Sequence, residues 1–136
     1  MAKFTLEFED VFDFKLIGIF SHVKDYRLCW EINKALSFDF QKSENLTITF
    51  KGNNQMYSFF EYTNEEDMLD YYLIANRSEY GTLIPEEKCD YFLLIKGIIK
   101  DRAFELLIKR IKELNLVLAT AEIEVEQLKS KENLIF

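Results

Sequence analysis

The sequence predicts an α+β domain in which an antiparallel β-sheet meander carries two packed helices. Three observations support this class. The 136 residues match the length of one domain. The apolar positions alternate with a period of two in some segments and follow helical spacing in others. Short polar loops separate the strand-like segments, which favours antiparallel pairing of sequential strands. We therefore predict a single domain, residues 1–136, with the element order β-β-α-β-β-β-β-α-β.

The composition indicates a well-packed interior. Hydrophobic residues make up 49% of the chain, with 13 Phe and 7 Tyr among them, whereas only 4 Gly and 1 Pro are present. Aromatic side chains bury large areas, and few Gly and Pro residues argue against disorder. The chain has the material for one substantial core.

The strand predictions rest on alternation and on short apolar runs. In residues 46–50, Leu46, Ile48 and Phe50 alternate with threonines, and the following Gly52-Asn53-Asn54 is a turn signal, so a hairpin with residues 56–62 is expected. Residues 90–96 are apolar on both faces and predict a central strand. The full set of predicted strands is 3–8, 15–20, 46–50, 56–62, 71–76, 90–96 and 117–125.

Two segments have helical spacing. In the first, Ser21 is a candidate N-cap, and the helix should end near Ser37; its apolar stripe contains Leu28, Cys29, Ile32, Ala35 and Leu36. The second, residues 104–114, has an apolar stripe made of Phe104, Leu107, Ile108, Ile111 and Leu114.

The net charge of −7 is concentrated in one quarter of the chain. Residues 58–90 hold two basic residues, Arg77 and Lys88, and nine acidic ones: Glu61, Glu65, Glu66, Asp67, Asp70, Glu79, Glu86, Glu87 and Asp90. An acidic surface repels phosphate groups and so disfavours nucleic acid as a partner. Two interpretations stay open: solvated acidic loops, or a docking face for a basic partner.

The sequence favours a cytoplasmic location. Its first residues lack a signal-peptide pattern, and no apolar run approaches the roughly 20 residues of a membrane span. Cys29 and Cys89 lie 60 residues apart, outside any metal-binding pattern. We expect two free thiols, no metal and no cofactor.

Residues 84–91 read Ile-Pro-Glu-Glu-Lys-Cys-Asp-Tyr, the pattern Ile-Pro-Glu-x-x-x-Asp-Tyr. With residues 25–30, 76–78 and 128–134, this segment resembles the IPExxxDY family, small proteins of Bacteroidota named for the motif. The resemblance implies a cytoplasmic bacterial protein. It implies no substrate, cofactor or catalytic residue.

The motif region supplies the candidate site. If the strands on either side of residues 78–88 pair, Arg77 lies almost opposite Asp90, and Glu86 overhangs the same end of the sheet. This group could clamp the loop or bind a ligand or partner. A second candidate is the basic stretch with Lys129 and Lys131, which could hold an anion or an acidic partner, or could simply be solvated.

The sequence contains no phosphate-binding glycine loop, HExxH helix or nucleophile elbow. A capping or surface role is favoured for the single histidine, His22. We therefore predict a non-catalytic binding or adaptor protein that contacts another protein through its sheet and an acidic loop face. The alternative is a small-molecule binding domain with a polar pocket near Arg77, Glu86 and Asp90. A homodimer is left open.

Overall fold

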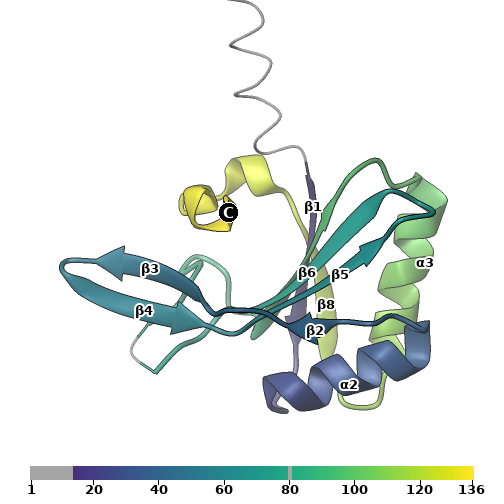
Figure 1. Cartoon of the computed structure of the whole chain (residues 1–136), viewed down its shortest axis with the longest axis horizontal. Coiled ribbons are helices and arrows are strands. Elements are labelled where there is room, and N and C mark those ends of the chain that lie inside the picture. The colour runs from purple at the N-terminus through teal and green to yellow at the C-terminus, as the bar shows by residue number, and fades with distance from the viewer. Residues whose placement is uncertain (1–13, 80) are drawn as a thin grey trace, which may run out of the picture.

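The computed structural model describes residues 14–79 and 81–136, so the strand expected at 3–8 lies outside the described residues. The described chain forms a six-stranded antiparallel sheet, a separate two-stranded hairpin and two helices (Figure 1). The predicted α+β class is confirmed. The strands of the large sheet, in spatial order, are β2 (Gln41–Lys42), β5 (Phe59–Asn64), β6 (Leu69–Ala75), β7 (Tyr91–Lys96), β1 (Phe14–Phe20) and β8 (Ala119–Ile123).

The meander extends over β5, β6 and β7, but β1 then lies between β7 and β8. Leu16 pairs with Leu94 on one side and with Ile123 on the other. Ile17 and Ile19 are fully buried. A strand that is apolar on both faces is most stable in the middle of a sheet with both faces covered, which is the position of β1.

Both helices cover the same face of the sheet. The helix α2 (Asp25–Leu36) and the helix α3 (Asp101–Lys112) bury their apolar stripes against β1, β6 and β7. Ser21 does not cap α2, because the N-cap position is Lys24 and no side chain caps it. The Ser21 hydroxyl instead donates to the Leu116 carbonyl at 2.7 Å and ties β1 to the segment that precedes β8.

The opposite face is covered without a long helix. The loop 76–90 and two short 3₁₀ turns, η1 (Val125–Gln127) and η2 (Lys131–Leu134), bury a second group of apolar side chains against the sheet. Leu134 is fully buried, and the Phe136 ring makes an edge contact with Phe59 at 4.8 Å between centroids. The last apolar residues therefore dock on their own domain.

The predicted hairpin is present, but the second of its strands differs from the expected one. β3 (Leu46–Phe50) pairs with β4 (Asn53–Tyr57), and Ser58 separates β4 from β5 of the main sheet. The turn consists of Lys51 and Gly52, both with positive φ, as two-residue hairpin turns require. One continuous strand over residues 56–62 was therefore wrong. The hairpin extends beyond the main sheet (Figure 1).

Several element ends also differ from the sequence prediction. α3 begins at Asp101, before the first apolar residue of its stripe, and β8 is shorter than the predicted strand 117–125. β2 was not predicted, since two exposed polar residues carry no periodicity.

Two glycines with positive φ allow a matched test of the fold. Gly97 has φ +117°, and a Cβ there would lie 2.7 Å from the Met68 carbonyl oxygen, whereas a Cβ on Gly52, at φ +80°, would meet nothing within 4 Å. Gly52→Ala should cost about 1–2 kcal/mol of unfolding free energy from backbone strain. Gly97→Ala should cost clearly more, because a backbone atom blocks the added methyl group. Urea denaturation of both variants checks this, and equal losses would contradict it.

Candidate functional site

Four of the five named residues of the Ile84–Tyr91 motif each anchor a different part of the molecule. Ile84 is fully buried in the core on the face opposite the helices. Tyr91 donates its hydroxyl to the Val23 carbonyl at 2.6 Å, just before α2. Glu86 and Asp90 accept hydrogen bonds from two further segments, described next. The motif therefore holds together parts of the chain that are distant in sequence.

Arg77 and Asp90 form the contact that the strand pairing predicted. Arg77 Nε lies 3.2 Å from Asp90 Oδ1, and Arg77 Nη2 donates to the Lys88 carbonyl at 3.1 Å. The second oxygen of Asp90 accepts from the Ser21 amide at 2.9 Å. The side chains are 57% and 24% exposed, so the ion pair is screened by water and is worth about 0–1 kcal/mol. Asp90 connects the end of β1 to the loop.

Glu86 does not join this pair. Its carboxylate accepts from the Ser130 amide at 2.7 Å and from the Ser130 hydroxyl at 3.0 Å. Partial burial acts to raise the pKa of Glu86, but hydrogen bonds from its own amide, Ser130 and Lys129 outweigh it and lower the pKa. Arg77, Glu86 and Asp90 thus divide between two contacts instead of gathering at one pocket mouth.

The two lysines of the predicted basic stretch, Lys129 and Lys131, also do not converge on one site. Lys129 is exposed, and Lys131 Nζ lies 3.5 Å from the Glu126 carbonyl oxygen. It is the backbone amide of Lys129, not its ammonium group, that helps to lower the pKa of the Glu86 carboxyl. The structure therefore connects this stretch to the motif through main-chain donors.

Asn76 is the residue that sequence reasoning missed. Its buried side chain donates to the Glu87 carbonyl at 3.1 Å and to the Cys89 carbonyl at 2.9 Å, and accepts from the Ile84 amide at 2.8 Å. A carboxamide can make these bonds because it carries both donors and an acceptor. The available signal was an asparagine at the end of an otherwise apolar strand.

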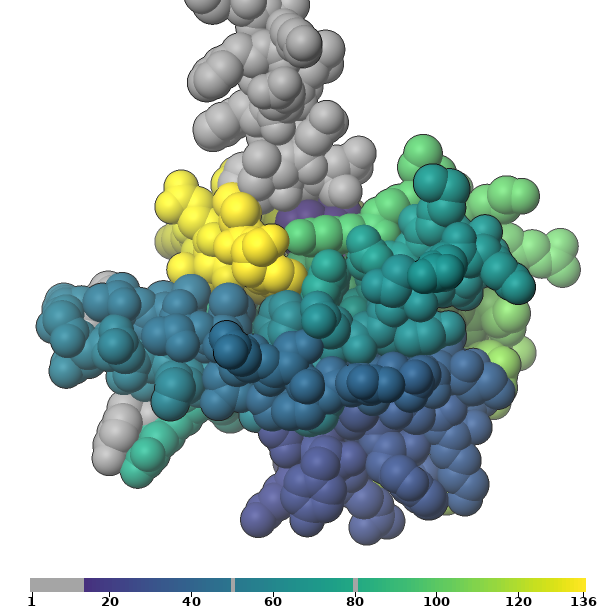
Figure 2. All heavy atoms as spheres, viewed as in Figure 1, coloured from purple at the N-terminus to yellow at the C-terminus, as the bar shows by residue number. Residues whose placement is uncertain are grey.

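A cavity of about 550 Å³ lies beside the motif loop, between the β3–β4 hairpin and the C-terminal segment. Figure 2 shows the C-terminal segment, in yellow, above the hairpin, in blue and teal. The cavity is lined by Ile48, Lys51, Asn53, Gln55, Tyr57, Gly81, Thr82, Pro85, Ser130 and Asn133. Arg77, Glu86 and Asp90 are not among the lining residues.

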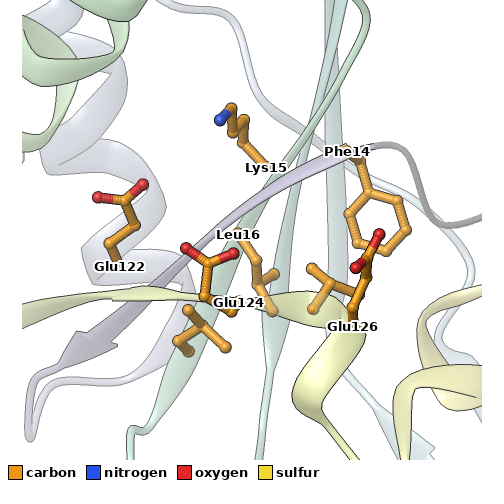
Figure 3. Close-up of a pocket in the computed structure, with 8 residues that line it drawn as sticks. Phe14, Lys15, Leu16, Glu122, Glu124 and Glu126 are labelled. Carbon is orange, nitrogen blue, oxygen red and sulfur yellow. The ribbon is translucent and has the colours of Figure 1, made fainter.

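A smaller cavity, of about 260 Å³, lies along β1 and β8 near Glu122, Glu124 and Glu126. Figure 3 shows these three carboxylates spread along the strand and the turn that follows, not converging on one point. The ammonium group of Lys15 lies over the Phe104 ring, 5.5 Å from its centroid. Among the described residues, no three His, Cys, Asp or Glu side chains are placed to hold a metal ion.

Both cysteines are free and buried, as expected. Burial raises the pKa of Cys29 to about 11 and that of Cys89 to about 12, with nearby carboxylates adding to the shift. A thiol must ionise to act as a nucleophile, and burial disfavours that ionisation; Cys29 packs in the core on the helix side of the sheet and Cys89 in the core on the opposite side.

The acidic quarter of the sequence forms two separate surfaces. The acidic residues at 65–67 precede β6, and those between 79 and 90 follow it. The two groups therefore lie at opposite ends of this strand. At the first end Gly97, which follows β7, lies close against the β5–β6 turn, since a Cβ there would be 2.7 Å from the Met68 carbonyl oxygen. Met68 and Ile98 are 83% and 95% exposed there. We call this group, Glu65, Glu66, Asp67, Met68 and Ile98, the acidic turn surface.

No helix in the described residues is long and apolar enough to cross a membrane. Comparison with protein-family models and with curated protein sequences found no match.

Neighbouring residues Asn76 and Arg77 provide a matched test of what holds the motif loop. Asn76→Asp keeps the shape but turns an oxygen toward two carbonyl oxygens, so it should cost at least about 3 kcal/mol of unfolding free energy. Arg77→Ala should cost about 1 kcal/mol or less, because the ion pair is exposed. Chemical denaturation of both variants measures the difference. A larger loss for Arg77→Ala would overturn this assignment.

The Glu86–Ser130 contact should be lost in acid. Because the folded-state pKa of Glu86 is lowered, its stabilising effect is fully present above the unfolded-state value and disappears as the pH falls through the lower folded value. NMR titration should show the Ser130 amide shift following the Glu86 carboxyl. In Glu86→Gln this shared transition should be absent; its persistence would show that another group is responsible.

Proposed function

We propose that this chain is a non-catalytic adaptor domain that binds another protein through the acidic turn surface. The observation that carries the proposal is the exposure of Met68 and Ile98, two large apolar side chains that lie beside three carboxylates at one end of the sheet. Apolar anchors surrounded by charge are typical of docking surfaces, since burial supplies affinity and charge supplies specificity.

The charges favour a partner with a basic segment. Glu65, Glu66 and Asp67 are all exposed, and the apolar pair beside them gives such a segment an anchor. Lys100 and Arg102 lie beyond Ile98, so the acidic character is strongest on the β5–β6 turn itself. The partner we propose therefore places lysine or arginine side chains over the turn and an apolar side chain between Met68 and Ile98.

A second exposed apolar surface lies on α2, where Tyr26 and Trp30 point to solvent. Lys34 Nζ lies 5.0 Å from the Trp30 ring centroid, and Arg27 is also exposed. Arg27 is paired with Glu31 at 3.8 Å, whereas the ammonium group of Lys34 would repel a basic segment. This face therefore serves as a comparison surface in the test of the proposal.

The same proposal includes a cytoplasmic location and membership of the IPExxxDY family. The intact motif at residues 84–91 supports the membership. The motif's contacts are internal, and so they fit a role in holding the domain rather than in binding the partner.

The proposal is tested by affinity capture from the native cytoplasm with matched charge reversals. Glu65→Lys, Glu66→Lys and Asp67→Lys together should abolish capture of a stoichiometric partner, and Ile98→Asp alone should weaken it at least tenfold. Glu122→Lys, Glu124→Lys and Glu126→Lys change the same number of charges elsewhere and should leave capture intact. Raising the salt concentration should weaken the wild-type complex, because the charges are exposed.

Three results would overturn the proposal: no stoichiometric protein, equal loss in both triple variants, or loss only when Trp30 is replaced by Ser. A bound metabolite in native mass spectrometry without any protein partner would favour a small-molecule function instead.

A further inference from the structure

The described residues that line the 550 Å³ cavity beside the motif loop combine apolar surface with uncharged polar side chains, and include one charged residue, Lys51. Its size falls within the usual range for small-molecule sites, roughly 300–1,000 Å³. Lys51, which is exposed, supplies the charged group of the lining. The remaining polar groups are three carboxamides and three hydroxyls, from Asn53, Gln55, Asn133, Tyr57, Thr82 and Ser130.

The Tyr57 hydroxyl points to a ligand. Tyr57 is only 3% exposed, and its hydroxyl makes no hydrogen bond within the described part of the chain. No fully buried polar side-chain atom there lacks a partner, so this hydroxyl opens on the cavity. It lies next to Gly81, where an added Cβ would be 3.3 Å from it. An unpaired hydroxyl on a buried side chain is costly unless water or a ligand bonds it.

The walls of the cavity are held by contacts already present. Ser78 Oγ donates to Gln55 Oε1 at 2.8 Å, and Asn133 Nδ2 donates to the Leu83 carbonyl at 2.8 Å. Each bond uses one side of a carboxamide, so the Gln55 NH₂ group and the Asn133 oxygen can still bond a ligand. Ser130 is fixed by Glu86. Polar groups in fixed positions lower the cost of binding.

We propose that this cavity binds a neutral polyhydroxylated molecule, of the class of monosaccharides and disaccharides. The described lining residues include no carboxylate for a cation, and for an anion they offer Lys51, which is exposed. A flat aromatic ligand would need an exposed ring to stack on, and the aromatic ring among the described lining residues, that of Tyr57, is buried. Mixed hydroxyl and carboxamide groups, which both donate and accept, match sugar hydroxyls, which do the same.

NMR titration of the full chain with D-glucose, N-acetylglucosamine and maltose tests the proposal. At least one should give saturable shifts of backbone amides in residues 53–57, 81–85 and 130–133. Tyr57→Phe should weaken that binding by about two- to tenfold, the effect of one neutral hydrogen bond, without lowering the melting temperature. Gly81→Ala, which narrows the cavity, should weaken it as well. Tyr62→Phe, on the other face of the sheet, is the matched control.

The proposal is overturned if none of the three sugars gives saturable shifts, or if Tyr57→Phe and Tyr62→Phe bind alike. It is also overturned if glucose 6-phosphate binds while the neutral sugars do not, since that result would make Lys51 the determining group. Capture of a protein through the acidic turn surface is independent of these outcomes, because that surface and the cavity share no residue.

Discussion

The hydrogen bonds of Asn76 close one face of this sheet, and most of the features on that face depend on them. The loop 76–90 leaves the end of β6 and returns to β7 over an apolar surface, where unpaired peptide groups would be costly. The Asn76 side chain takes up two carbonyls and one amide of this loop. Its own peptide groups bond Asp90 and Leu83. One residue thereby pairs five main-chain groups of the loop, at Leu83, Ile84, Glu87, Cys89 and Asp90.

Once the loop is fixed, it supports the parts of the chain that follow. Ile84 and Leu83 are placed in the core, and Glu86 and the Leu83 carbonyl become available to hold Ser130 and Asn133. The C-terminal segment can then cover the sheet, and the cavity acquires a wall on each side. The motif residues thus act as a structural frame, and the proposed functions belong to groups around that frame. The two proposed sites are separate: one is an acidic end of the sheet, and the other is a cavity whose described lining carries a single charged residue, Lys51.

The sequence predicted part of the candidate site because part of it is set by strand register. Arg77 and Asp90 flank strands that are neighbours along the chain, so their contact follows from a hairpin-like pairing. The partner of Glu86 lies 44 residues further on, with α3 and β8 in between, and no local pattern indicates it. Asn76 was overlooked because the value of a buried amide depends on which groups surround it.

Local patterns determined the class of the fold, the two helices and most of the strands, because alternation and helical spacing reflect contacts between residues close in sequence. They also determined the net acidity and the free thiols. Only the tertiary structure decided that β1 lies between β7 and β8, that Ser58 separates the hairpin from the sheet, and that the acidic quarter forms two surfaces. These outcomes depend on which apolar faces cover one another and on where a strand begins and ends. Such contacts join segments that are distant in sequence. A periodic pattern predicts a strand or a helix, but it does not indicate which other segment that element pairs with.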